Sequence, residues 1–499
     1  MTIRTFIAVV SGVLVVTASS CKKFLATYSQ NQVFVTKATD LDEILVGEGY
    51  PEYCGDSRYL FIMDDDAVEN PPAETPAGGD IGVSFLESFY YWQPNPYLAS
   101  NGYVATYEQT MFYYIYKSIS RINTVIFNVP LMRAKGEPDS ILVRVDGEAH
   151  FLRGLYYLML VNTFGEPYSP ATANKDIGVP LKTDPAIEDK FFSRATVKQV
   201  YDQVVADLQT AEKELERFNA ASVLRANQAA AQALLSRVYL YMENYDSAIS
   251  YADKVTGRDY KITDLNNFDD SKDFLQLKSP ETIFNLDNNM STIVSVLFDN
   301  TIYTTDVYRA SDDLLNSFPQ GDLRKDAFFK TTSTGAVPAK AGKDGSYDVS
   351  DAFLIRLPEI YLNKAEALAI SGKEAEAIAV LQELRKNRLK PENLTTVSLS
   401  GADLVNFIRD ERRRELCFET HRWFDLRRYA VNSKYPYSKT IHHISYAYNA
   451  TGRYVQGYYE LKPYDQDKTA YVVPIHPDEI SFNQGVLTNE QRPVRPLIK

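Results

Sequence analysis

The chain has 499 residues, and its 53 lysines and arginines against 65 aspartates and glutamates give a net charge of −12. This acidic balance argues against nucleic acid as a partner, because binding to phosphates requires basic patches. With 45% hydrophobic residues, the chain can bury one large core or two smaller ones. Three cysteines are too few for a disulfide framework in a chain of this length.

Residues 1–20 have the pattern of an export signal. Arg4 precedes an apolar run at 6–16 that is too short to span a bilayer. Small residues then come directly before Cys21, where a lipoprotein signal peptidase would leave the cysteine as the first residue. We therefore expect a signal peptide and an acylated Cys21 that anchors residues 21–499 to a membrane. The alternative is ordinary secretory cleavage with Cys21 unmodified, since Ala18 stands where leucine is usual.

Beyond this segment, no apolar stretch has the length of a membrane span, so the anchor would be the only attachment. Cys54 and Cys417 are the remaining cysteines, and they are compatible with one disulfide or with two free thiols.

Three segments are predicted to be rich in loops. Residues 64–105 mix prolines and glycines with aromatic residues, which is typical of a long ordered loop rather than a linker. Residues 285–347 are irregular, and residues 435–499 open with a tyrosine-rich stretch that includes strand-like patterns. The 35 tyrosines of the chain carry a ring with a polar tip, which suits hydrated recognition surfaces.

Helical periodicity dominates elsewhere and predicts a helical frame at about 107–256 and 353–430. Amphipathic helices are predicted at about 107–127, 141–164, 196–218 and 402–428. Residues 230–255 and 357–388 each read as two helices with a short turn, at 243–244 and 371–373 respectively. Small residues four positions apart allow close packing, so we interpret these pairs as tetratricopeptide-type repeats in one compact body.

Four segments carry a recognisable pattern. They read GEAHFLRGLYYLMLVNTFGEPY at 147–168, RANQAAAQALLSRVYLYMENYDSAI at 225–249, RDERRRELCFETHRWFDLRR at 409–428 and PIHPDEISFN at 474–483. In order and spacing the sequence resembles the RagB/SusD family of Bacteroidetes outer-membrane lipoproteins over nearly its whole mature length. The third segment is the most specific, since helix pairs alone occur in many unrelated adaptors.

The resemblance implies a mainly α, SusD-like fold with a helical-repeat scaffold and a loop-rich ligand-binding half. It also implies a protein without enzymatic activity or cofactor, lipid-anchored to the outer membrane and facing the cell exterior. Such a protein would bind oligosaccharides or other nutrients and deliver them to a SusC-like TonB-dependent transporter. Two alternatives are an anchored interaction scaffold without a small ligand and a surface glycoside hydrolase.

The segment 409–428 also has a plain physical interpretation. Its acidic residues stand three or four positions before arginines, as in Glu411 to Arg414 and Asp425 to Arg428. Such spacing builds ion pairs along a helix. We therefore favour a structural charge network here over a ligand-binding or catalytic role.

Sugar recognition requires flat aromatic faces flanked by groups that hydrogen-bond hydroxyls. Two segments offer this mixture. The candidate ligand-binding residues are Asp65, Asp66, Asn70, Tyr91, Trp92, Asn95 and Tyr97 in the first segment, and Tyr303, Asp306, Tyr308 and Arg309 in the second. Trp92 is either a plug for the scaffold or an open platform, and we expect Tyr303 and Tyr308 to be exposed.

Signatures of enzymes are scarce. The five histidines form no zinc-binding helix pair, no G-x-S-x-G elbow or complete P-loop is present, and His442 and His443 are expected as an exposed strand pair. The run Asp64 to Asp66 could supply the carboxylate pair of a glycosidase, but a polar binding loop is the favoured interpretation. Residues 285–289 resemble part of a calcium loop, yet Met290 replaces the required glycine, so no metal is predicted.

Overall fold

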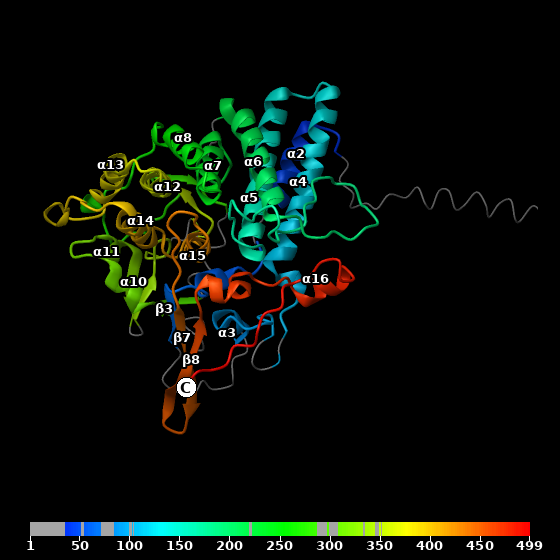
Figure 1. Ribbon diagram of the computed structural model, residues 1–499. Coiled ribbons are helices and arrows are strands. Elements are labelled where there is room, and N and C mark those ends of the chain that lie inside the picture. The colour runs from blue at the N-terminus through cyan, green and yellow to red at the C-terminus, as the bar shows by residue number, and fades with distance from the viewer. Residues whose placement is uncertain are drawn as a thin grey trace, which may run out of the picture.

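Three long helices form one side of the protein (Figure 1). α4 (Met111–Ala134), α5 (Asp139–Phe164) and α6 (Val197–Glu214) pack in sequence order. The computed structural model describes residues 35–50, 54–70, 84–98, 102, 104–218, 222–286, 297–298, 308–332, 335–344, 349–350 and 352–499. The predicted Cys21, Tyr303 and Asp306 lie outside the described residues.

Local sequence signals explain where these helices begin and how closely they pack. The Thr110 side chain accepts a hydrogen bond from the Tyr113 amide at the start of α4, and Thr196 with Gln199 forms a capping box at the start of α6. A Cβ atom at Gly147 of α5 would lie 2.7 Å from Cγ of Leu215. Glycine at this position therefore permits the close approach of α5 to the end of α6.

The two predicted helix pairs are confirmed. α7 (Gln228–Tyr241) and α8 (Tyr245–Thr256) form the first pair, and α12 (Leu357–Ile370) and α13 (Glu374–Arg385) form the second. Ala248 and Ala365 are among the small residues that are fully buried within the pairs. α8 packs on α12, so the second pair continues the first in space although about a hundred residues separate them (Figure 1).

The predicted continuous helix at 402–428 is wrong in its middle. α14 (Gly401–Leu416) ends before residues 417–421, which lead to α15 (Arg422–Ala430). Phe418 and Thr420 both adopt left-handed backbone conformations, with φ of 56° and 60°. The Thr420 hydroxyl accepts a hydrogen bond from the Phe353 amide at 3.0 Å, a tertiary contact that supports this break.

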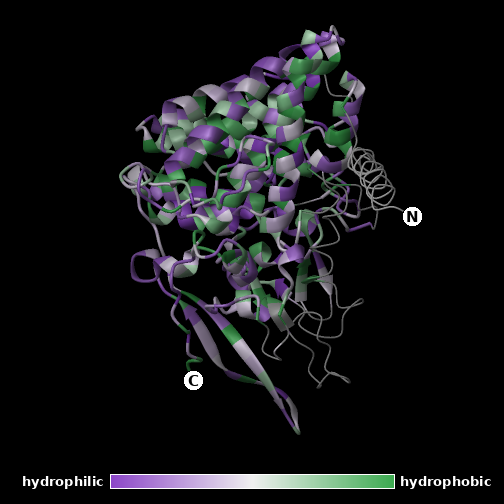
Figure 2. Ribbon diagram, turned by 90° about the vertical axis from the view of Figure 1, so that its right-hand side faces the viewer, coloured by the Kyte–Doolittle hydropathy of each residue, from purple (hydrophilic) through white to green (hydrophobic). Residues whose placement is uncertain are grey.

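Strands are few in the described chain, all except β7 and β8 are short, and each pairs antiparallel with one partner. The pairs are β1 (Ala67–Glu69) with β3 (Tyr308–Ala310), β2 (Thr282–Phe284) with β6 (Ile355–Arg356), β4 (Phe329–Thr332) with β5 (Gly335–Pro338), and β7 (Ile441–Asn449) with β8 (Gly452–Leu461). The β7–β8 hairpin projects from the body in both views (Figures 1 and 2).

Shorter helical elements connect these parts. They are α2 (Ala38–Ile44), η1 (Leu45–Gly49), η2 (Arg58–Phe61), α3 (Ser84–Tyr90), η3 (Tyr107–Gln109), η4 (Leu215–Arg217), η5 (Leu265–Asn267), α10 (Asp312–Ser317), α11 (Arg324–Phe328), η6 (Pro391–Asn393), η7 (Tyr464–Gln466), η8 (Lys468–Tyr471) and α16 (Pro477–Phe482).

A large hydrophobic core runs through the body, and a smaller cluster around Leu362, Leu381 and Leu404 holds α12, α13 and α14 together. Apolar and polar residues are interleaved along the helices (Figure 2), as expected for helices that bury one side. No helix in the described part of the chain combines the length and the apolar character that crossing a membrane requires.

Candidate ligand-binding site

The two predicted binding segments meet in the structure. β1 follows the acidic run of the first segment, and β3 carries Tyr308 and Arg309 of the second. The antiparallel register places Glu69 opposite Tyr308 and Val68 opposite Arg309. Residues some 240 positions apart in sequence therefore form one local structure.

Asp65 and Asp66 are both buried, and each forms ion pairs with basic side chains. Asp65 accepts hydrogen bonds from Arg422 at 2.7 and 2.8 Å and from Lys439 at 2.6 Å, and Asp66 accepts one from Arg413 at 2.6 Å. Burial alone would raise the pKa of Asp65, but the charges of Arg422 and Arg413 outweigh it and hold that pKa well below its usual range. In this structure the two carboxylates bind the charge network of α14 and α15 and are not open to a ligand.

The three consecutive carboxylates do not favour a metal or a catalytic pair. Oxygen atoms of Asp64, Asp65 and Asp66 lie within 4.8 Å of one another. However, the cationic side chains already bound to Asp65 and Asp66 would repel a divalent ion. Burial, together with the charges of Asp66 and Asp65, raises the pKa of Asp64 well above its usual range. The cluster is therefore best explained as a structural ion network.

The aromatic residues of the first segment form a buried stack. His443 of β7 lies between Trp92, with ring centroids 4.2 Å apart, and Tyr90, with centroids 3.8 Å apart. Tyr90 meets Tyr308 edge-on at 5.2 Å. Trp92 and Tyr308 are each only 1% exposed. Trp92 is thus a plug rather than an open platform, and the expectation that Tyr308 is exposed is wrong.

His443 also differs from its prediction as an exposed residue. His442 is exposed, but His443 is buried, with Nδ1 2.6 Å from the Tyr90 carbonyl oxygen and Nε2 2.9 Å from that of Asp64. Burial lowers the pKa of His443 to about 4, although both carbonyl contacts oppose this effect. The strand alternation of β7, which places neighbours on opposite faces, explains why only one histidine points outward.

Trp92 adopts a left-handed backbone conformation, with φ of 50°. The Gln93 amide donates to the Ser88 carbonyl and the Trp92 amide to the Phe89 carbonyl, which is the Schellman pattern at the end of α3. Glycine is the usual residue at this position. The indole nitrogen donates to the Met63 carbonyl at 2.9 Å, so tertiary contacts of the ring offset the backbone strain.

Tyr91 and Tyr97 are buried as well. The Tyr91 hydroxyl donates to the Glu69 carboxylate at 2.7 Å, and its ring stacks on Tyr459 of β8 with centroids 4.3 Å apart. The Tyr97 hydroxyl donates to the Pro474 carbonyl at 2.9 Å. Both rings therefore connect the first segment to the C-terminal part of the chain.

The remaining predicted residues lie closer to solvent. Asn95 is exposed, whereas Asn70 and Arg309 are half-buried. Arg453 of β8 donates to the Asn70 side chain at 3.5 Å, and its guanidinium lies 4.8 Å from the ring centroid of Tyr446. We call Asn70, Arg309, Tyr446 and Arg453 the hairpin-edge surface.

The hairpin-edge surface combines the half-buried ring of Tyr446 with hydrogen-bonding side chains. This is the combination that sugar recognition requires. Tyr446 and Arg453 were not among the predicted site residues, although the tyrosine-rich stretch with strand-like alternation was a signal for them. Their contact with the first segment depends on hairpin packing that periodicity does not reveal.

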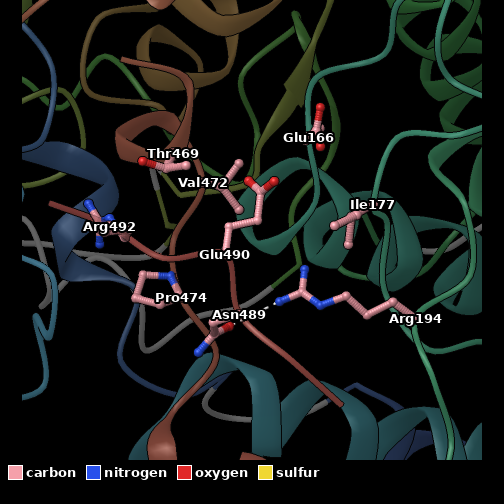
Figure 3. A pocket seen from close by; sticks show the side chains of 9 residues that line it. All are labelled: Glu166, Ile177, Arg194, Thr469, Val472, Pro474, Asn489, Glu490 and Arg492. Carbon is pink, nitrogen blue, oxygen red and sulfur yellow. Dashed lines mark hydrogen bonds between the residues drawn. The ribbon is translucent and has the colours of Figure 1, made fainter. Parts of the chain in front are cut away.

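A separate small cavity lies between the end of α5 and the C-terminal residues (Figure 3). Its volume is about 10 Å³, which is room for roughly one water molecule. Arg194 donates to the Asn489 side chain at 3.1 Å across it. Burial lowers the pKa of Arg194 to about 10 and that of Arg492 to about 9. The cavity is too small for a sugar.

Two family descriptions match the chain. One, described as "SusD family", matches residues 216–491, which is more than half of the chain. The chain belongs to the SusD family. The other, described as "Starch-binding associating with outer membrane", matches residues 66–240.

Two SusD-like proteins of Formosa agariphila are related in sequence. SusD-like protein P2 is 25% identical over 376 residues, which cover 64% of this chain and 71% of that protein. SusD-like protein P38 is 24% identical over 345 residues, which cover 56% of this chain and 65% of that protein.

Solved structures share the fold. A SusD superfamily protein from Bacteroides thetaiotaomicron matches with a TM-score of 0.70 at 23% identity, over 92% of this chain and all of the other. A SusD-like carbohydrate binding protein from Bacteroides vulgatus matches with a TM-score of 0.64 at 20% identity, over 90% and 97%. The predicted mainly α, SusD-like fold is therefore confirmed. Membership in the SusD family also supports the prediction of a protein without enzymatic activity.

Proposed function

We propose that this SusD-family protein binds oligosaccharides, or other nutrients, at the cell surface and delivers them to a SusC-like TonB-dependent transporter. The observation that carries the proposal is the hairpin-edge surface, where the Tyr446 ring and the side chains of Asn70 and Arg453 lie together. Pyranose rings present an apolar face that stacks on such rings and hydroxyls that pair with amide and guanidinium groups.

The relatives support the ligand class. A family description that matches residues 66–240 names starch binding, and a structural neighbour is a carbohydrate binding protein. The same description names association with the outer membrane, which agrees with acylation at Cys21 as the proposed anchor. Transport energy would come from the transporter, because this chain would only bind the ligand and hand it over.

Calorimetry against a panel of oligosaccharides tests the binding step. The full-length lipoprotein, purified in detergent, is compared with an Asn70→Ala, Arg453→Ala double variant and with an Arg133→Ala control on an exposed ion pair of α4. Saturable binding that the double variant weakens on the order of tenfold supports the proposal. Binding that the double variant retains would move the site away from the hairpin-edge surface.

Copurification tests delivery. An affinity-tagged chain expressed in its own host should retain an outer-membrane transporter after detergent extraction. A folded protein that binds no oligosaccharide or peptide yet retains the transporter would favour the alternative function, an anchored scaffold built on the helix pairs α7–α8 and α12–α13. Release of reducing ends from a glycan would instead contradict a protein that only binds.

A further inference from the structure

A groove separate from the hairpin-edge surface opens beside the start of α4. Residues 180–192 and α16 form its other boundaries, and its volume is about 590 Å³. Figure 1 places α16 next to the lower end of α4, whereas the β7–β8 hairpin projects elsewhere. Sites for small molecules commonly have volumes in this range.

Aromatic side chains dominate the lining. They are Phe112, Tyr113, Tyr116, Phe191, Phe192 and Phe482. Phe482 is 77% exposed and Phe191 is 41% exposed. A single exposed ring on a protein surface needs no explanation, but several rings that converge on one groove indicate a surface that is kept apolar for contact.

The loop that borders the groove is firmly held. The Tyr116 hydroxyl donates to the Pro180 carbonyl at 2.6 Å, and the Asn123 amide group donates to the Lys182 carbonyl at 2.8 Å. These bonds fix the beginning of the loop on α4. The wall is therefore present before any ligand arrives, which reduces the entropy that binding costs.

Ion pairs and cation–π contacts hold the rest of the loop together. Lys182 and Lys190 share the carboxylate of Glu188 at 2.5 and 2.6 Å. Both ammonium groups also lie over the ring of Phe192, 5.3 and 4.8 Å from its centroid. Hydrogen bonds from the two lysines lower the pKa of Glu188. The carboxylate is therefore charged at neutral pH, and its ion pairs with both lysines are kept.

The charges along the groove balance. Lys117, Lys182 and Lys190 stand against the carboxyl groups of Glu188, Asp189 and Glu479. Within the described residues, Lys117 and Glu479 form no ion pair with another side chain. Burial and the neighbouring Asp478 raise the pKa of Glu479. The groove thus offers both donors and acceptors to a ligand without favouring either sign of charge.

We infer that this groove is a second ligand site, for an uncharged oligosaccharide chain. A sugar ring can stack on Tyr113 or Phe482 while its hydroxyls pair with Lys117 and Glu479. A charged ligand would meet as many like as unlike charges. A wholly apolar ligand would strip water from the lysines and carboxyl groups without replacing their hydrogen bonds. The ligand class rests on the proposed function, but the site does not include the hairpin-edge surface.

A tryptophan placed in the groove tests the inference. The native Trp92 and Trp423 are each only 1% exposed, so their emission responds weakly to a surface ligand. Phe482→Trp adds an indole that is open to solvent. Phe127→Trp is the matched control, because Phe127 is 54% exposed on α4 but does not line the groove. The probes are neutral oligosaccharides, oligouronides, chitosan oligomers and aromatic peptides, added to full-length protein in detergent.

We expect a saturable change in emission of the Phe482→Trp variant with at least one neutral oligosaccharide, and no change in the Phe127→Trp control. Adding Tyr113→Ala should weaken the apparent affinity on the order of tenfold. Adding Asn70→Ala with Arg453→Ala should leave this affinity unchanged, because those residues belong to the hairpin-edge surface.

Other outcomes separate the two proposals. A silent reporter in a protein that binds oligosaccharides by calorimetry would overturn the groove site and leave the proposed function intact. A silent reporter and no calorimetric binding would overturn both. A response only to charged glycans or to peptides would show that the groove takes a different class of ligand.

Discussion

Asp65 and Arg422 form a two-point ion pair inside the protein, with donor to acceptor distances of 2.7 and 2.8 Å, although 357 positions separate them in sequence. The pair attaches the loop that leads into β1 to the first turn of α15. β1 in turn pairs with β3 and precedes Asn70 of the hairpin-edge surface. The charged segment 409–428 therefore supports the proposed binding surface without being part of it.

Removing either partner of this pair should destabilise the whole protein. Asp65→Asn would leave Arg422 and Lys439 near a buried amide that cannot neutralise them, and breaking a buried ion pair in this way costs about 3 to 5 kcal/mol. Urea denaturation followed by circular dichroism measures the change. Asp139→Asn, whose partner Arg133 is exposed, is the control and should cost less than about 1 kcal/mol. Equal effects of the two variants would show that Asp65 has no special structural role.

The helical frame was largely predictable from sequence. The pairs at 228–256 and 357–385 have small buried residues at helical spacing and a short turn. Both features can be recognised within a short stretch of sequence, without knowledge of tertiary contacts. The break between α14 and α15 was not predictable, because Phe418 and Thr420 interrupt a charge pattern that continues on both sides. The local ion pairs of Arg414 with Glu411 and of Arg428 with Asp425 are present. Glu419 stands three positions before Arg422, which is also ion-pair spacing, but it pairs with Arg356 and Lys340.

The candidate site was only partly predictable. Composition identified the two segments that meet at β1 and β3, but it did not distinguish a buried ring from an exposed one. The burial of Trp92 and Tyr308 depends on His443 and on the hairpin, which lie far away in sequence. The groove beside α4 was missed for the same reason, since its lining comes from three separated parts of the chain.

At position 92, glycine should destabilise the protein less than alanine does, which is the reverse of the usual order within a helix. Truncation of the buried ring should cost about 3 to 5 kcal/mol in either case. Because the position is left-handed, alanine should carry an additional cost of about 1 kcal/mol that glycine avoids. Urea denaturation of Trp92→Gly and Trp92→Ala measures the difference in unfolding free energy.

Ser88, within α3, supplies the control for this comparison. There the usual order applies, and Ser88→Gly should be less stable than Ser88→Ala by about 0.5 to 1 kcal/mol. If the alanine variant is the more stable one at both positions, the left-handed backbone at position 92 does not determine the order of the glycine and alanine variants there.

The two described cysteines should be unreactive thiols in the native protein. Cys54 and Cys417 are both buried, and burial raises the pKa of Cys417 to about 12. A maleimide added at neutral pH should label neither residue until urea unfolds the chain, because reaction requires an accessible thiolate. Mass spectrometry of the protein extracted from membranes should then show two labels. A third label would mean that Cys21 carries a free thiol and is not acylated.

Acid should destabilise the protein through carboxylates that are buried against arginines. Glu366 accepts hydrogen bonds from Arg428 at 2.7 and 2.9 Å and from Arg409 at 3.1 Å. Burial alone would raise the pKa of Glu366, but the charges of Arg428 and Arg409 outweigh it and lower that pKa to about 2, from an ordinary value of 4.5. The unfolded chain therefore binds a proton at higher pH than the folded chain does. The stabilisation is complete above about pH 5 and is lost as the pH falls toward 2.

For Glu366 alone, this difference corresponds to a loss on the order of 3 kcal/mol in the free energy of unfolding. Urea denaturation at several pH values between about 6 and about 3 measures the slope. Glu366→Gln should be less stable at neutral pH, because Arg428 and Arg409 lose their charged partner. Its stability should nevertheless fall less steeply with acid than that of the wild type, whereas Glu383→Gln, from an exposed pair with Lys386, should keep the wild-type slope. A Glu366→Gln variant with the full wild-type slope would assign the acid sensitivity to other groups.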